Sequence, residues 1–238
     1  MRQCYYGHHK DGVLGTNSRE LVVFDLDGTL VDSEHQISVA TNETRRLFGL
    51  SPAKSGQLQS WFGKHPEIFF SELSSEDTGL AVNSFRTALS ESLHLVKPSL
   101  GAHNLLDYLK GMNVALAVAT TKPSWLAESV IREVGMSTYF DHVQGSEGLN
   151  PKPSTDVFEK VEESLGFSPK FKFAIGDRIS DMKASVSAGY RSTLLSSWFR
   201  ELNDVEFSFM LATKYKRVGS LSQYQEDLSR QFSRMARN

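Results

Sequence analysis

The feature that most constrains the fold is a short apolar run that ends in two closely spaced acids. Residues 21–24 (Leu-Val-Val-Phe) are all apolar, a pattern typical of a short buried strand. Asp25 follows directly, Asp27 comes two residues later, and Gly28 permits a sharp reversal of the chain. Two carboxylates this close repel each other, so burying both costs free energy unless a cation or a reaction uses them. The segment therefore predicts a strand-end site in which one acid serves as nucleophile and metal ligand and the other moves protons.

The same stretch also fits a plain hairpin. Asp-Gly is a favoured two-residue turn, and an aspartate can stand there for turn geometry alone. Only the rest of the chain distinguishes a hairpin from a strand-end site.

Composition is ordinary for a globular protein and excludes several classes of function. The 238 residues, 39% of them hydrophobic, can bury a large core and leave room for a second, smaller domain. A net charge of -2 gives no basic footprint for nucleic acid, and no apolar run approaches the length of a membrane span. The single cysteine, Cys4, fits a reducing compartment. We therefore expect a cytoplasmic monomer or homodimer that binds neither nucleic acid nor membrane.

Residues 1–19 are polar, contain the pair His8-His9, and lack the apolar centre of a signal peptide. We expect a flexible N-terminal extension there. The seven histidines of the chain show no metal-ligand spacing.

Strand and helix patterns alternate after the opening motif. We expect strands at 21–24, 114–119, 139–143, 171–175, 191–195 and 207–212. We expect helices at 124–134, 155–165 and 181–188. This alternation predicts an α/β fold with a Rossmann-like parallel sheet as its core.

Residues 32–97 interrupt the alternation with helical periodicity alone. One run leads from Ile37 to Gly49 and a second spans 80–95, and breaks follow at Ser51-Pro52 and at Lys97-Pro98-Ser99. The pattern predicts an inserted, mainly helical cap domain at 32–97 above a core made of 20–31 and 98–238. Arg45 and Arg46, in the first of these helices, are expected at its surface.

Three predicted strands end in polar residues, and a lysine lies between the last two of them. Asp25 and Asp27 follow the first strand, Thr120 follows another, and Asp177 follows a third. Because the carboxyl ends of parallel strands meet in one crevice, these side chains are expected to converge. Lys152 stands between two prolines and adds a cation to the set.

This ordered set resembles the haloacid dehalogenase-like hydrolase superfamily, in its phosphoglycolate-phosphatase-like branch with a helical cap. The resemblance covers about residues 21–195. It rests on Asp25-Leu26-Asp27-Gly28-Thr29-Leu30, Thr120, Lys152 and Gly176-Asp177-Arg178-Ile179-Ser180-Asp181.

The resemblance implies a catalytic role for four residues. Asp25 is expected to attack phosphorus and form an aspartyl-phosphate, while Asp27 protonates the leaving alkoxide and then deprotonates water. Thr120 is expected to hold phosphoryl oxygens, and Lys152 to balance the charge on Asp25. Thr120 and Lys152 have plainer alternatives. Thr120 could cap the next helix, and Lys152 could be a solvated loop residue.

The resemblance also implies Mg²⁺ as cofactor. Asp25, the backbone carbonyl of Asp27, and Asp177 are the expected ligands, because Mg²⁺ prefers hard oxygen donors. Asp181, about one helical turn after Asp177, is a supporting residue that could orient Lys152 or reach the metal through water. Its plainer alternative is to balance the dipole of its helix.

Substrate binding is expected from the cap and the phosphate pocket. The segment Trp61-Phe62-Gly63-Lys64-His65-Pro66 resembles a cap loop that enters the site, which makes Gly63, Lys64 and His65 candidates. The alternative is that Trp61 and Phe62 belong to the cap's own core. Thr121 borders the phosphate pocket, where many relatives have Asn.

We therefore predict a Mg²⁺-dependent phosphoric monoester hydrolase that acts on a small phosphate ester, such as a phosphoglycolate-like compound, a sugar phosphate or a nucleotide. Asp27 argues against a dehalogenase, because a halide leaves without a proton. A phosphomutase of the same fold and a non-catalytic, phosphate-binding regulatory protein remain alternatives.

Overall fold

The computed structural model of the chain describes residues 19–196, 215–235 and 237. Its strands are β1 (Leu21–Phe24), β2 (Val31–Asp32), β3 (Lys97–Pro98), β4 (Ala115–Ala119), β5 (His142–Gln144), β6 (Lys172–Gly176), β7 (Arg191–Leu195) and β8 (Lys216–Val218). Its α-helices are α1 (Glu34–Leu47), α2 (Ser55–Trp61), α3 (Ser75–Glu91), α4 (Ala102–Gly111), α5 (Ser124–Glu133), α6 (Asp156–Leu165), α7 (Ile179–Ser187) and α9 (Leu221–Met235). Two short 3₁₀ helices, η1 (Pro66–Phe70) and η2 (Leu93–Leu95), lie on either side of α3.

Six parallel strands form the central sheet, in the order β5-β4-β1-β6-β7-β8. The strand β1 lies between β4 and β6, and Phe24 is level with Val118 on one side and Ile175 on the other. The hairpin alternative for Asp27-Gly28 is therefore wrong, because β1 pairs with two parallel strands. The α/β class with a Rossmann-like parallel sheet is confirmed.

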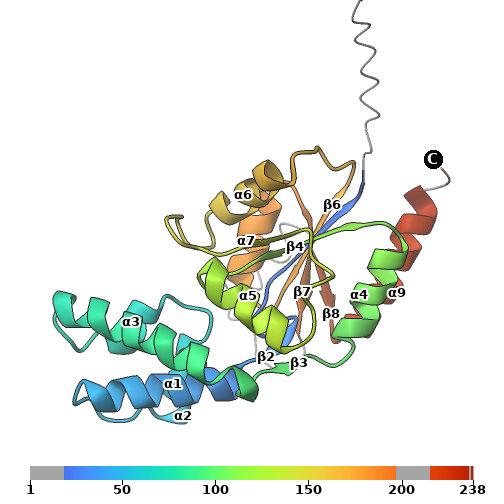
Figure 1. Cartoon of the computed structure of the whole chain (residues 1–238). Coiled ribbons are helices and arrows are strands. Elements are labelled where there is room, and N and C mark those ends of the chain that lie inside the picture. The colour runs from blue at the N-terminus through green and yellow to red at the C-terminus, as the bar shows by residue number, and fades with distance from the viewer. Residues whose placement is uncertain (1–18, 197–214, 236, 238) are drawn as a thin grey trace, which may run out of the picture.

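Side chains of β1 alternate between the two faces of the sheet, and both faces are covered by helices (Figure 1). Val22 and Phe24 pack in the cluster that includes α4, α5 and α9. Leu21 and Val23 pack in the opposite cluster, with α6 and α7. A strand buried on both faces has to be apolar throughout, which explains the continuous apolar run in the sequence.

The helices between β2 and β3 form a separate layer beyond the carboxyl edge of the sheet (Figure 1). They share a hydrophobic cluster centred on Phe69, Phe70 and Phe85. The chain leaves the core along β2 and returns along β3, and these two strands pair antiparallel. The predicted limits of a separate cap domain, 32 and 97, fall on this ribbon, and the division into domains stays a prediction.

Some expected elements differ from the structure at their ends. The strand expected at 139–143 is β5 (His142–Gln144), because Tyr139 closes a turn on the Met136 carbonyl. The helix expected from 181 already begins at Ile179. The strand expected at 207–212 and the extension at 1–19, except for its last residue, lie outside the described residues. In the described ranges, no helix is long and apolar enough to cross a membrane.

Arg45 is buried, contrary to the expectation that it lies at the surface of its helix. Its guanidinium donates to the carbonyls of Ser51 and Phe69 and pairs with Glu72 at 2.7 Å. It also lies 5.4 Å from the ring of Trp61. The arginine therefore ties α1 to the segment that follows α2, and periodicity alone could not show these partners.

We expect Arg45→Met to destabilise the protein by about 2–4 kcal/mol, because it leaves two buried carbonyls without a donor. Arg46→Met, at the exposed neighbouring position, is the matched control and should change stability by less than about 0.5 kcal/mol. Urea unfolding of both variants checks this. Equal stabilities would show that the Arg45 contacts contribute nothing.

Candidate active site

The sheet register brings the polar strand ends to one edge. The backbone N–H of Asp25 donates to the Ile175 carbonyl at 2.9 Å, which sets the end of β1 beside the end of β6. Gly28 has φ +81°, and a Cβ there would lie 2.5 Å from Asp177 Oδ2. Only glycine lets the loop after β1 pass this close to the carboxylate of Asp177. The sequence prediction that these strand ends share a crevice agrees with this arrangement.

Lys152 reaches this edge from the loop between β5 and α6. Its ammonium donates to Asp25 Oδ1 at 2.8 Å, to Asp181 Oδ1 at 2.7 Å and to the Ala119 carbonyl at 2.8 Å. The side chain is only 3% exposed. Burial works to lower the pKa of Lys152, but the charges of Asp181 and Asp25 outweigh burial and raise it. The lysine is therefore held as a cation between two acids, and it is not a solvated loop residue.

Three carboxylates form a cluster that suits a hard divalent cation. Oxygen atoms of Asp25, Asp177 and Asp181 all lie within 4.8 Å of one another. Burial, opposed by Lys152, raises the pKa of Asp25 to about 7, and burial together with Asp25 raises the pKa of Asp177. Asp177 Oδ1 is buried without a hydrogen-bond donor. A donor set of hard oxygens with one unsatisfied atom fits Mg²⁺.

Asp181 has two partners at the start of α7. Its Oδ1 accepts from Lys152, and its Oδ2 accepts from the backbone N–H of Arg178 at 3.0 Å. Asp181 therefore contacts both Lys152 and the N-terminus of α7, and its supporting role stays a prediction.

The carboxylate of Asp27 is held by a residue that the sequence analysis did not single out. Lys122 Nζ lies 2.5 Å from Asp27 Oδ1 and 2.6 Å from Oδ2, and Ser33 Oγ donates to Oδ1 at 2.5 Å. Lys122 is only 7% exposed. Its position two residues after the strand-end Thr120 was the available sequence signal. The predicted role of the Asp27 backbone carbonyl as a metal ligand stays a prediction.

The two threonines after β4 occupy different positions. Thr120 is buried, and its Oγ1 accepts from the backbone N–H of Lys122 at 3.2 Å. Thr121 lines the cavity, and its carbonyl accepts from Ser146 Oγ at 2.6 Å. The Thr120 hydroxyl therefore stabilises the turn after β4. It does not cap the next helix, because α5 begins only at Ser124.

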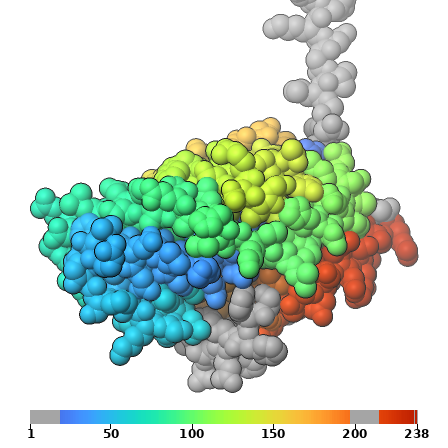
Figure 2. Space-filling view, turned by 60° about the horizontal axis from the view of Figure 1, so that its bottom comes forward, coloured from blue at the N-terminus to red at the C-terminus, as the bar shows by residue number. Residues whose placement is uncertain are grey.

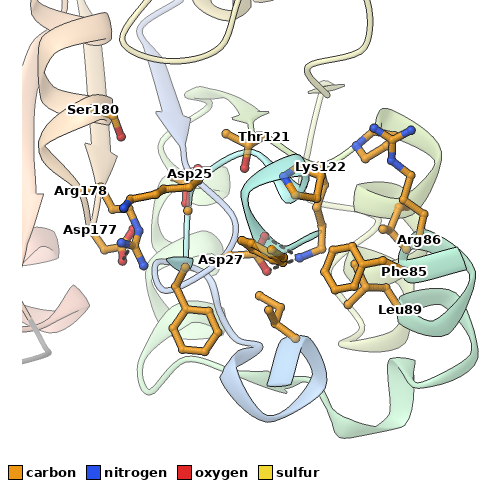
Figure 3. A pocket seen from close by; sticks show the side chains of 18 of the residues that line it. Asp25, Asp27, Phe85, Arg86, Leu89, Thr121, Lys122, Asp177, Arg178 and Ser180 are labelled. Atoms are coloured by element: carbon orange, nitrogen blue, oxygen red, sulfur yellow. Dashed lines mark hydrogen bonds and ion pairs between the residues drawn. The ribbon is translucent and has the colours of Figure 1, made fainter. Parts of the chain in front are cut away.

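A cavity lies between this edge of the sheet and the cap. The core side includes Asp25, Asp27, Thr121, Lys122, Asp177, Arg178 and Asp181. The cap side includes Ile37, Phe62, Gly63, Lys64, Pro66, Phe69, Phe85, Arg86 and Leu89. Figure 3 shows Phe85, Arg86 and Leu89 across the cavity from Asp177 and Arg178, with Asp27 and Lys122 between them. Figure 2 shows the teal and green surface of the later cap residues beside the yellow-green surface of α5, and α3 and η2 contact this helix.

The cap loop at 61–66 contributes to the cavity in part. Gly63 and Lys64 line the cavity. Within the described part of the chain, His65 is not a lining residue, and its Nδ1 lies 3.4 Å from a carboxylate oxygen of Glu67. The ring of Trp61 stacks on the ring of Phe69, with 5.6 Å between their centroids. This contact agrees with the alternative that Trp61 belongs to the cap's own core. The roles of Gly63, Lys64 and His65 in substrate binding stay predictions.

Comparison with known proteins identifies the family. The family model of haloacid dehalogenase-like hydrolases matches residues 22–195. Phosphoglycolate phosphatase 1 of Pseudomonas aeruginosa is 28% identical over 76% of this chain and 71% of its own. Phosphoglycolate phosphatase of Aquifex aeolicus is 28% identical over 81% of this chain and 92% of its own.

Solved structures agree with the fold. A haloacid dehalogenase-like family hydrolase from Streptococcus pneumoniae superposes with a TM-score of 0.70, at 24% identity over 84% of this chain and 93% of its own. A predicted phosphatase from Clostridium acetobutylicum superposes with a TM-score of 0.76, at 22% identity over 89% of this chain and 99% of its own. The chain belongs to the haloacid dehalogenase-like hydrolases. The resemblance and the hydrolase class predicted from the sequence are thereby confirmed.

Gly63 offers a test of the contact between cap and core. Its φ is +74°, and a Cβ there would lie 2.2 Å from Nε of Arg178, so Gly63→Ala must push the loop and the arginine apart. Gly49, also in the cap, has φ +72° and nothing within 4 Å, so Gly49→Ala carries the backbone strain without the collision. We expect both variants to lose about 1 kcal/mol of stability.

Only Gly63→Ala should loosen the loop at 61–66. Hydrogen exchange measures this directly, with faster exchange of the loop amides expected in Gly63→Ala and unchanged exchange in Gly49→Ala. Identical protection of the loop in both variants would contradict the contact.

Proposed function

We propose that the protein is a Mg²⁺-dependent phosphatase that hydrolyses a small phosphorylated metabolite through an aspartyl-phosphate on Asp25. The observation that carries the proposal is the position of Asp25. It lies at the end of the central strand, in hydrogen-bond contact with Lys152, beside two further acids, and it lines a cavity between the sheet and the cap.

In the proposed reaction Asp25 is the nucleophile, and Asp27 gives and takes the protons. An oxygen of Asp25 attacks phosphorus while the bond from phosphorus to the leaving oxygen breaks, and Asp27 gives that oxygen a proton. In the second half, Asp27 takes a proton from water as the water oxygen attacks phosphorus and the bond to Asp25 breaks. The partners of the two acids fit this division, since Lys152 contacts Asp25 and Lys122 contacts Asp27.

Asp25 and Asp177 would hold the Mg²⁺, with the backbone carbonyl of Asp27 as a third protein ligand and Asp181 as support. When bound, the ion would offset the repulsion between the carboxylate of Asp25 and the phosphoryl group. Lys152 adds its positive charge next to Asp25. Thr121 lines the cavity, and Thr120 with the backbone N–H groups near it would hold phosphoryl oxygens.

The cavity favours a small substrate with a second polar or anionic group. Its cap side combines apolar residues with Lys64 and Arg86. A cap that closes over the substrate would keep bulk water from the phosphoryl group. The curated relatives named phosphoglycolate phosphatases make a phosphoglycolate-like ester the first candidate.

We expect phosphate release from phosphoglycolate, a sugar phosphate or a nucleoside monophosphate, with Mg²⁺ present and lost in EDTA. Asp25→Asn should reduce turnover at least about 10⁴-fold and leave the fold intact, because the amide cannot act as the nucleophile. Asp107→Asn, at an exposed carboxylate on α4, is the control.

Near-wild-type turnover by Asp25→Asn would contradict the nucleophile assignment. An isomerised bisphosphate without free phosphate would favour the phosphomutase, and a folded protein that binds Mg²⁺ but releases no phosphate would favour a regulatory role.

Metal binding should release protons in a pH-dependent way. In the metal-free protein Asp25 has its pKa raised to about 7, so it holds a proton below that pH and a cation must displace it. We therefore expect Mg²⁺ affinity to increase as the pH rises from about 6 to 8, with fewer protons released at the higher pH. Calorimetry in buffers of different ionisation enthalpy checks this. A proton count and affinity that do not change with pH would contradict it.

A further inference from the structure

We infer that Lys122 is a positioning residue for Asp27: its ammonium fixes the carboxylate in the orientation from which Asp27 exchanges a proton with the leaving oxygen. This inference rests on the proposed function, in which Asp27 is the group that moves protons.

The backbone of Lys122 is held on both sides. Its N–H donates to Thr120 Oγ1 at 3.2 Å, and its carbonyl accepts from the backbone N–H of Ser146 at 3.1 Å. Pro123 follows and fixes the next φ angle. The base of the side chain therefore has a defined position relative to β4 and the loop after β5.

The ammonium contacts both oxygens of one carboxylate. Lys122 Nζ lies 2.5 and 2.6 Å from the two oxygens of Asp27, and in the part of the chain that the structure describes no other cation pairs with that carboxylate. The terminal torsion of an aspartate is broad when nothing restrains it. A contact to both oxygens restrains it, and proton transfer depends on such placement.

Burial indicates that this pair is more than a surface ion pair. Lys122 is 7% exposed and Asp27 is 21% exposed at the wall of the cavity. Removing an ammonium from water costs free energy, and lysine is rarely buried without a partner. The core already has Lys152 beside Asp25 and Asp181, so the second buried lysine serves a different acid.

The chemistry gives this role a specific signature. Departure of an alkoxide requires a proton, whereas 4-nitrophenolate leaves without one. A residue that acts through the proton transfer should matter for phosphoglycolate and little for 4-nitrophenyl phosphate. The quantity to compare is kcat/KM, which covers the steps up to departure of the alcohol.

The test compares Lys122→Met with Lys160→Met on these two esters. Methionine keeps the length of the side chain without its charge, and Lys160 is an exposed lysine on α6 that serves as the control. We expect kcat/KM of Lys122→Met to fall about 10²-fold for phosphoglycolate and less than about 3-fold for 4-nitrophenyl phosphate. On an Asp27→Asn background, Lys122→Met should add less than about 3-fold.

Each alternative gives a different result. An equal loss on both esters would show a structural role, and a full additional loss on the Asp27→Asn background would show direct contact with the substrate. Either result would overturn the inference and leave the proposed phosphatase in place. A wild-type protein that hydrolyses neither ester would overturn both.

A second variant keeps the test decisive if Lys122→Met does not fold, as its thermal unfolding will show. Lys122→Arg keeps the charge but replaces the single nitrogen with a planar fork. It should show the same selectivity between the two esters with a smaller loss, and an equal loss on both would overturn the inference.

Discussion

The arrangement of the site depends on one buried ammonium group, that of Lys152. Three carboxylates lie within 4.8 Å of one another at the carboxyl edge of the sheet, and acids this close destabilise the fold when their charges are not balanced. Lys152 contacts two of them, Asp25 and Asp181, although it lies 127 residues after the first. The Lys152 contact that balances this cluster is made to Asp25, which lines the cavity. In the proposed reaction, stability and chemistry would therefore share one interaction.

The parallel sheet gives this contact its setting. Because β1, β4 and β6 are in register, the residues that follow them meet at one edge, and helices cover both faces of the sheet. The cap layer covers the edge and adds an apolar wall with two cations, Lys64 and Arg86. Two buried lysines then separate the acids into pairs, Lys152 with Asp25 and Lys122 with Asp27. In the proposed reaction these are the nucleophile and the proton carrier.

Sequence reasoning succeeded where local pattern and burial coincide. The strand at 21–24 is apolar because both of its faces are covered, and its limits agree with β1. It was less accurate at 139–143, where apolar and aromatic residues pack from a turn before β5 begins. The expectation that Arg45 lies at the surface was wrong. The carbonyls that accept hydrogen bonds from its guanidinium belong to residues later in the chain, Ser51 and Phe69. A one-dimensional pattern contains no record of such partners.

The sequence by itself determined the class of fold, the family and the acids of the candidate site. These follow from local features: apolar runs of strand length, helical periodicity, and charged residues at fixed positions after each strand. The resemblance also led us to expect Lys152 beside Asp25. Only the tertiary structure showed that Lys122 pairs with Asp27 and that His65 lies beside Glu67. The physical reason is that a long flexible side chain takes its partner from whatever charge the folded backbone brings within reach, and residue order does not specify that distance.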